Sequence, residues 1–212
     1  MDAMEPDGQA GWSRRQIFGG IAFAALAFGI PFAAVTLTDI PRDTEVTDRQ
    51  RALMKEVSQL VIPRTQTPGA GDVGAGDFVI LALAHGLEKS REPAGGIVTS
   101  GWQHFIRADG TIDHIGWLEH ELDESAKGDF LRSPVAQRQT ALSALDAAAY
   151  AKDGPHPWRT LKALILTGYY TSEAGGSQEL RYEPVPGRWD PDLPLTPDFR
   201  AISNDWTAVD FG

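Results

Sequence analysis

The 212-residue sequence contains no cysteine. It therefore forms no disulfide, binds no iron–sulfur cluster through thiolates, attaches no c-type haem covalently and uses no cysteine nucleophile. Basic residues are also few, since 19 Lys and Arg stand against 29 Asp and Glu, for a formal net charge of −10. An acidic chain lacks the basic surface that binds nucleic acid. We therefore expect no nucleic-acid partner.

The motifs that carry chemistry are incomplete. Gly69-Ala-Gly71-Asp-Val-Gly74 matches the G-x-G-x-x-G pattern of dinucleotide-binding loops. A helix rather than a strand is predicted before it, so we do not expect it to bind a dinucleotide. His120-Glu-Leu-Asp-Glu124 places Glu where a zinc-binding H-E-x-x-H helix needs its second His. His85 is expected at the edge of the core. We predict no catalytic, cofactor-binding or metal-binding residue in this chain.

The amino-terminal residues resemble a twin-arginine export signal. Ser13, Arg14 and Arg15 precede an apolar run over residues 17–37. An ordinary secretory signal, or a membrane helix flanked by arginines, shows the same charge before an apolar segment. The run is long enough to cross a bilayer core of about 30 Å. We predict a signal or anchor segment at residues 1–38, and both cleavage and retention remain open.

Residues 39–212 are predicted to form one helical domain. Thr47 and Gln50 have the spacing of a capping box, and Pro63 ends the helix that begins there. Further helices are expected over residues 77–87, 115–125, 134–150 and 157–167, with Ser133 as a cap and Gly168 as a C-cap. The fold is therefore mainly α, an irregular bundle of four to five helices. An extended C-terminal arm, with one short strand at residues 180–182, follows from about residue 169.

The connector between the first two helices is the most informative stretch. Pro63 and Pro68 disfavour helix for the residues before them, and Gly69 is expected to supply a positive φ. We predict an ordered turn between two antiparallel helices. Glycine and proline also occur in loops that only join two helices.

Two motifs carry a resemblance to a known family. Ile62-Pro63-Arg64-Thr65-Gln66-Thr67-Pro68-Gly69-Ala70 resembles the hallmark of the gluconate 2-dehydrogenase subunit 3 family, with Gln66 where Asp is common. Gly168-Tyr169-Tyr170-Thr-Ser172-Glu173, followed by Tyr182 and Pro186-Gly187-Arg-Trp189, resembles a second family motif. The two occur in the expected order, and the resemblance covers most of residues 47–190.

The resemblance implies a non-catalytic small subunit. Such a subunit escorts a flavin-dependent sugar, polyol or sugar-acid dehydrogenase through the twin-arginine machinery, stabilises it and helps to locate it in the periplasm at the inner membrane. FAD is then expected in the large subunit and haem c in a cytochrome subunit, with no cofactor in this chain. The alternative is a stand-alone exported hydrolase that uses a carboxylate or metal site.

The resemblance also implies where a partner binds. Because the connector is rigid and because Tyr and Trp are favoured at interfaces, we predict one partner-binding surface built from both motifs. The late aromatics alternatively cap the chain's own core. The predicted partner-binding residues are Pro63, Thr65, Pro68, Gly69, Tyr169, Tyr170, Tyr182 and Trp189.

Overall fold

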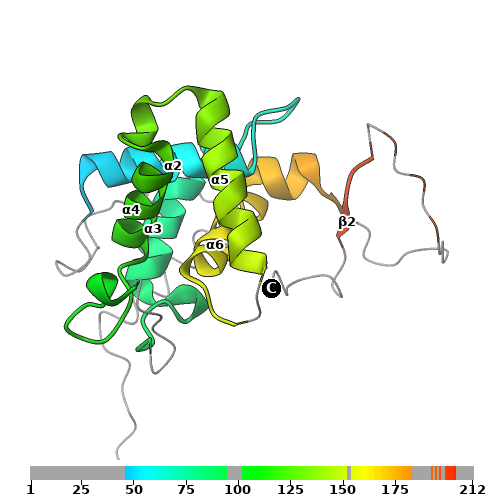
Figure 1. The fold of residues 1–212 in the computed structure, drawn as a ribbon. Helices are drawn as coiled ribbons and strands as arrows, with labels where there is room; N and C mark the ends of the chain where they lie inside the picture. The colour runs from blue at the N-terminus through cyan, green and yellow to red at the C-terminus, as the bar shows by residue number, and fades with distance from the viewer. Residues whose placement is uncertain are drawn as a thin grey trace, which may run out of the picture. The chain divides into compact units, whose positions relative to one another are not determined.

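The computed structural model describes residues 46–94, 102–151 and 154–182, together with residues 192, 194, 196 and 199–203. All of them belong to one unit, Thr36–Gly212. These residues form five α-helices: α2 (Asp48–Val61), α3 (Ala75–His85), α4 (His114–Ala126), α5 (Val135–Tyr150) and α6 (Pro157–Tyr170) (Figure 1). The predicted mainly α fold is confirmed.

The predicted targeting residues Ser13, Arg14 and Arg15, and the apolar run after them, lie outside the described residues. Among the helices that the structure describes, none combines the length and apolar character needed to cross a membrane.

Helix α2 begins and ends where the sequence predicts. The Thr47 hydroxyl accepts from the Gln50 amide at 3.1 Å, and the Gln50 side chain accepts from the Thr47 amide at 3.0 Å. This reciprocal capping box satisfies two amides that the first turn leaves without partners. At the other end, Ile62 is extended and Pro63 follows it. One face of α2, including Leu53, Met54 and Val57, is fully buried.

Helix α3 packs between α2 and α6. It starts two residues earlier than predicted, because Gly74 adopts a left-handed conformation (φ 82°) that turns the chain into the helix. The burial of α3 is not confined to one side. Nine of its residues, Ala75 and Gly76 and the whole of 78–84, are buried, whereas His85 is exposed. Burial on all sides explains why a helical period is hard to see in its sequence.

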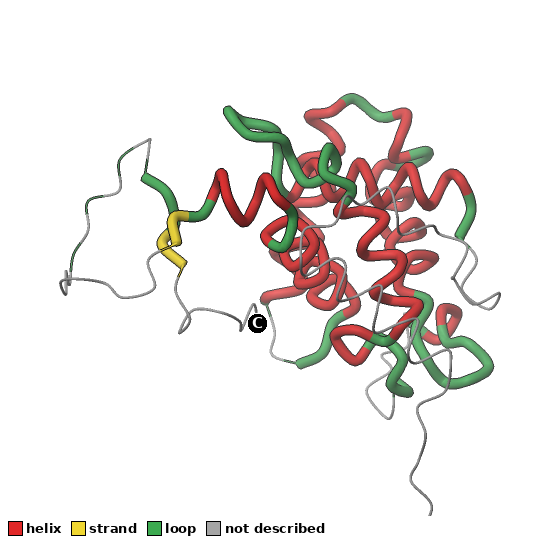
Figure 2. The backbone as a smooth tube through the Cα atoms, turned by 180° about the vertical axis from the view of Figure 1, so that it is seen from behind, coloured by secondary structure: helices red, strands yellow, loops and turns green. Residues whose placement is uncertain are grey.

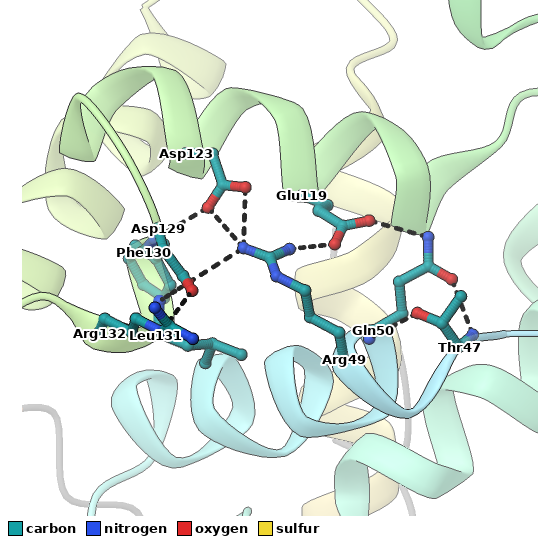
Figure 3. Close-up of polar contacts among 9 residues, drawn as sticks. All are labelled: Thr47, Arg49, Gln50, Glu119, Asp123, Asp129, Phe130, Leu131 and Arg132. Atoms are coloured by element: carbon teal, nitrogen blue, oxygen red, sulfur yellow. Dashed lines mark hydrogen bonds and ion pairs between the residues drawn. The ribbon is translucent and has the colours of Figure 1, made fainter.

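Helix α4 is tied to α2 by an arginine cluster (Figure 3). The Arg49 guanidinium donates to Asp123 at 2.8 and 2.9 Å, to Asp129 at 3.1 Å, and to Glu119. Glu119 and Asp123 therefore do not simply face water, because they bind a cation from another helix. Gln50, besides its capping role, donates to Glu119 at 2.9 Å.

The cluster changes the proton affinity of its members. Burial lowers the pKa of Arg49, but hydrogen bonds to Asp123 and Glu119 outweigh this effect and raise it. For Asp129, burial acts in the opposite direction and raises the pKa. The hydrogen bond from Arg49 outweighs this effect, so the pKa of Asp129 is lowered overall. Arg49 and Asp129 are therefore charged at neutral pH.

Helix α5 is joined to α2 and to α6 by ion pairs. Arg138 contacts Glu56 of α2 at 2.7 Å, and Asp146 accepts from Lys162 and from the Trp158 indole of α6, each at 2.7 Å. Ser133 does not cap this helix as predicted. Its hydroxyl instead donates to the Asp129 carbonyl at 3.2 Å, and the first helical residue is Val135.

Helix α6 extends three residues beyond its predicted end, to Tyr170. The predicted C-cap role of Gly168 is wrong, since this glycine lies inside the helix. A Cβ at Gly168 would lie 2.7 Å from Cδ1 of Phe78. Gly168 therefore lets α6 approach α3 closely. Trp158, Leu161, Leu164 and Ile165 are buried, as predicted.

A π-helical turn, η8 (Ala174–Glu179), continues beyond α6 where the sequence predicts an extended arm (Figure 2). The two glycines at positions 175 and 176 do not exclude helix here. A Cβ at Gly175 would stand 2.1 Å from the Tyr169 carbonyl oxygen, so the tight turn requires glycine. The predicted strand is present as β1 (Arg181–Tyr182), which pairs in parallel with β2 (Ile202–Ser203).

The remaining described segments are short turns. Two 3₁₀ turns, Leu87–Lys89 and Gln103–Phe105, lie between α3 and α4. A third 3₁₀ turn, Phe130–Arg132, leads into α5. Helices α2 and α6 each contact the other four helices, so the core lies between them. This arrangement brings the connector after α2 next to the end of α6.

Candidate partner-binding surface

The connector, residues 62–74, is an ordered loop with an exposed tip. The Ile62 carbonyl accepts from the Ala70 amide at 2.9 Å, and the Thr67 carbonyl accepts from the Thr65 amide at 3.1 Å. These bonds close the loop at its base and at its tip. The residues at the tip, Pro63, Arg64, Thr65 and Gln66, are exposed. The prediction of an ordered turn is confirmed by this geometry.

Gly69 has a different role from the predicted one. It does not have a positive φ; in the connector that conformation occurs at Gly74. A Cβ at Gly69 would lie 2.7 Å from the Arg64 amide nitrogen, and one at Gly71 would lie 2.6 Å from the Lys55 carbonyl oxygen. Gly71 therefore lets the connector pass directly over the α2 backbone, and Gly69 lets the connector fold back onto its own backbone at Arg64.

Asp72 holds the connector in shape. Its carboxylate accepts from the Gly69 amide at 2.9 Å and from the Gln59 side chain at 3.3 Å, and it pairs with Arg64 at 2.8 Å. The Arg64 hydrogen bond, followed by the Gly69 amide, lowers the pKa of Asp72. The carboxylate is therefore charged at neutral pH and connects the loop tip to its base.

The end of α6 braces the connector from outside. The Tyr169 hydroxyl donates to the Pro68 carbonyl at 3.1 Å, and the Thr67 hydroxyl donates to Glu179 at the end of η8. The structure thus brings the first family motif together with the start of the second, at Tyr169. Both figures of the whole chain show the connector beside η8 (Figures 1 and 2).

The late aromatic residues divide into different environments. Tyr169 is only 1% exposed, so its ring belongs to the chain's own core and is out of a partner's reach. Tyr170 is half-buried, and its ring meets that of Tyr169 edge-on at 5.2 Å. Burial is the first cause that raises the pKa of both phenols, so both are neutral at pH 7. Trp189 and the Tyr182 side chain lie outside the described residues.

We call the exposed tip residues together with Tyr170 the connector surface. Its backbone is fixed by glycine packing, by Asp72 and by the contacts to Tyr169 and Glu179. A surface that is already ordered loses little conformational entropy on binding. Whether Pro63, Thr65, Pro68, Gly69, Tyr170, Tyr182 and Trp189 contact a partner stays a prediction.

A second feature was missed by sequence reasoning. A cavity of about 290 Å³ lies where the turns after α3 meet the starts of α4 and α6, with His114 and His156 in its wall. His156 is the N-cap of α6: its Nδ1 accepts from the Trp158 amide at 3.2 Å. The signal for this cap was Pro157, since Pro favours the first helical position and marks the residue before it as the cap.

The incomplete zinc motif on α4 does not form a cluster. His120 is exposed and lies against the Phe105 ring at 5.5 Å, whereas His114 is buried. Across the described part of the chain, no group of three or more His, Asp or Glu residues is arranged to hold a metal ion. The acids Glu119, Asp123 and Asp129 instead form ion pairs with Arg49.

The fold and its polar contacts define a small helical protein with an ordered, exposed connector. The model of the family gluconate 2-dehydrogenase subunit 3 matches residues 48–187, which is most of the chain and includes the first motif and the second as far as Gly187. The chain belongs to this family. No curated protein and no solved structure matches the chain. Membership is consistent with a small subunit of a multi-subunit dehydrogenase complex.

Proposed function

We propose that this chain is the non-catalytic small subunit of a periplasmic, FAD-dependent sugar, polyol or sugar-acid dehydrogenase. It escorts the large subunit through twin-arginine export, stabilises it and helps to locate it at the inner membrane, where a cytochrome c subunit takes the electrons. The match of residues 48–187 to the family model carries the proposal. That family is named as a subunit of a dehydrogenase, and its name implies partner chains.

The connector surface supports the partner-binding part of the proposal. Its tip is exposed although the connector is held by contacts from α2, α6 and η8. A loop that served only to join two helices would not need this bracing. Tyr170, half-buried and in ring contact with Tyr169, has the chemistry of an interface anchor.

Co-purification with a co-expressed flavin dehydrogenase large subunit tests this part. Tyr170→Ala is expected to weaken the complex by about thirtyfold if Tyr170 is a central anchor. Trp189→Ala is expected to act in the same direction. Tyr150→Ala, at the exposed end of α5, is the matched control and is expected to leave the affinity unchanged. An unchanged complex in the Tyr170 variant, with intact helical circular dichroism, would contradict the assignment of this surface.

Fractionation of cells tests the escort part. Replacing Arg14 and Arg15 together by Lys is expected to leave both this chain and the large subunit in the cytoplasm. A signal peptide of the ordinary secretory route, fused in place of residues 1–38, is the control. If periplasmic dehydrogenase activity stays at its normal level in the double variant, the escort role is wrong.

A further inference from the structure

The cavity at His114 and His156 is not used by the proposed function. Its volume of about 290 Å³ is close to the lower end of the range of roughly 300–1,000 Å³ that small-molecule sites occupy. Part of its wall is apolar, formed by Pro93, Trp102, Ile112 and Pro155. The polar side chains in this wall are the two imidazoles together with Glu88, Lys89, Glu92 and Thr160.

The hydrogen bonds of the two rings fix their tautomers. Nδ1 of His156 accepts from the Trp158 amide at 3.2 Å, so in the neutral ring the proton is on Nε2. Nδ1 of His114 lies 3.0 Å from the Ile112 carbonyl oxygen and must donate to it, so its Nε2 carries the lone pair. The two imidazoles therefore supply one hydrogen-bond donor and one acceptor, in addition to the hydroxyl and charged groups of the wall. No described residue hydrogen-bonds to either Nε2 atom.

Both rings are neutral and held in place. Burial lowers the pKa of His114 to about 4 and is also the main cause that lowers the pKa of His156. The His156 ring is contacted edge-on by Trp102 at 5.3 Å and by Trp117 at 5.4 Å. His114 is 7% exposed. A ligand would thus meet preorganised groups rather than mobile side chains.

The charged residues of the wall limit the charge of a ligand. Glu88 and Glu92 stand against one cation, Lys89, so this side of the cavity carries a net negative charge. An anionic ligand is therefore disfavoured. Glu88 and Lys89 both have a left-handed backbone, with φ of 51° and 57°. Two successive non-glycine residues in this conformation store strain, which is common at binding sites.

From this geometry we propose that the cavity is a binding site for an uncharged, planar small molecule that carries one hydrogen-bond acceptor and one donor. Its ring stacks on or packs against Trp102. Its acceptor accepts a hydrogen bond from the Nε2–H group of His156, and its donor donates a hydrogen bond to Nε2 of His114.

Benzamide and benzoate are matched probes for this proposal. They have nearly the same shape, but benzamide is neutral and carries a donor and an acceptor, whereas benzoate is an anion with acceptors only. We expect benzamide to bind the purified full-length chain with a dissociation constant of about 10 mM or lower, which suits a ligand of this size. The readout is a saturable shift of the imidazole and indole NMR signals of His114, His156 and Trp102. Benzoate is expected to bind at least about tenfold more weakly.

Two substitutions keep the local fold and remove one contact each. His156→Asn preserves a cap for the Trp158 amide, because Asn is among the best N-cap residues, but its side chain is too short to replace Nε2. His114→Asn keeps a donor for the Ile112 carbonyl and removes the acceptor. Each is expected to weaken benzamide binding about three- to tenfold, the effect of one lost hydrogen bond. His120→Asn, on the exposed part of α4, is the matched control.

Three results would overturn the proposal. They are the absence of a saturable shift at the cavity residues up to the solubility limit of benzamide, equal affinity for benzamide and benzoate, and unchanged affinity in both His156→Asn and His114→Asn while their circular dichroism matches that of the unaltered chain. None of these results depends on the large subunit, so failure here leaves the proposed dehydrogenase role to its own test.

Discussion

The hydroxyl of Tyr169 donates a hydrogen bond of 3.1 Å to the backbone carbonyl of Pro68, a residue 101 positions earlier in the chain. The bond joins the end of α6 to the connector and fixes the spatial relation of the first family motif to the start of the second. It also explains why Tyr169 is buried although the sequence suggested an interface residue. The connector keeps its shape through contacts within this chain, before any partner is present.

The first prediction concerns that bond. Tyr169→Phe keeps the ring in the core but removes the donor to Pro68, so the free energy of unfolding is expected to fall by about 1 kcal/mol. Urea denaturation followed by circular dichroism measures it. Tyr150→Phe, at a tyrosine that is 52% exposed, is the control and is expected to change stability by less than about 0.5 kcal/mol. Equal effects in the two variants would show that the Tyr169 hydroxyl does not brace the connector.

The second prediction concerns the helix crossing at Gly76. A Cβ there would lie 2.8 Å from the Lys55 amide nitrogen and 2.8 Å from the Met54 carbonyl carbon, both backbone atoms that cannot turn away. Gly76→Ala is therefore expected to destabilise the chain by about 1–3 kcal/mol, although Ala favours helix by roughly 1 kcal/mol. Gly168→Ala is expected to cost less, since it meets only the Phe78 side chain. Thermal unfolding of both variants tests this order. Ser143→Ala, at an exposed residue of α5, is the control.

The third prediction concerns the arginine cluster. Arg49→Met removes the cation that Glu119, Asp123 and Asp129 share, and leaves Asp129 only its pair with the exposed Arg132. The side chain of Arg49 is 34% exposed, so solvent screens the pairs, and the expected loss of stability is about 1–2 kcal/mol. Arg132→Met is the control, because Arg132 is 88% exposed and pairs with the same Asp129. A double-mutant cycle between Arg49 and Asp123 that gave no coupling would contradict a structural role for the cluster.

The fourth prediction concerns pH and the connector. The Arg64 hydrogen bond holds the pKa of Asp72 below its unfolded value of about 3.9, so Asp72 stabilises the connector at neutral pH. This contribution is lost as the pH falls through the folded-state pKa. Asp72→Ala is expected to remove it at all pH values, which speeds hydrogen exchange of the Gly69 amide near neutral pH.

Asp109→Ala is the matched control for that experiment. Asp109 accepts from the Thr111 amide at 3.0 Å and so orders a different loop in the same way. Its loss is expected to leave exchange at Gly69 unchanged. Similar acceleration of Gly69 exchange in both variants would mean general loosening of the chain rather than a local brace.

Local sequence signals predicted the helices but not how they meet. The capping box at Thr47 and the stop at Pro63 depend only on neighbouring residues, and both are confirmed. Gly168 shows the limit of this reasoning. A glycine at the end of an apolar run usually ends a helix, but here its role is set by Phe78, which is 90 positions away in the sequence and adjacent in space.

The same limit applies to the polar residues. Arg49 finds its acids on α4 and in the turn after it, and no spacing rule relates residues 70 to 80 positions apart. The acidic face of α4 consequently looked like an ordinary solvated face. The cavity was equally invisible, because the turn after α3 and the first turns of α4 and α6 all contribute to its wall. By contrast, the two family motifs predicted a shared surface, and the structure does bring the first motif together with the start of the second.

The Tyr169–Pro68 bond also imposes an order on folding. Helix α2, the connector and α3 are contiguous in sequence, so their association closes only a short loop and requires little of the remaining chain. Tyr169 leaves the ribosome 101 residues after Pro68. During synthesis the connector therefore lacks the bond from Tyr169 until α6 has emerged. A partner that recognises the braced connector thereby distinguishes a finished subunit from an incomplete one.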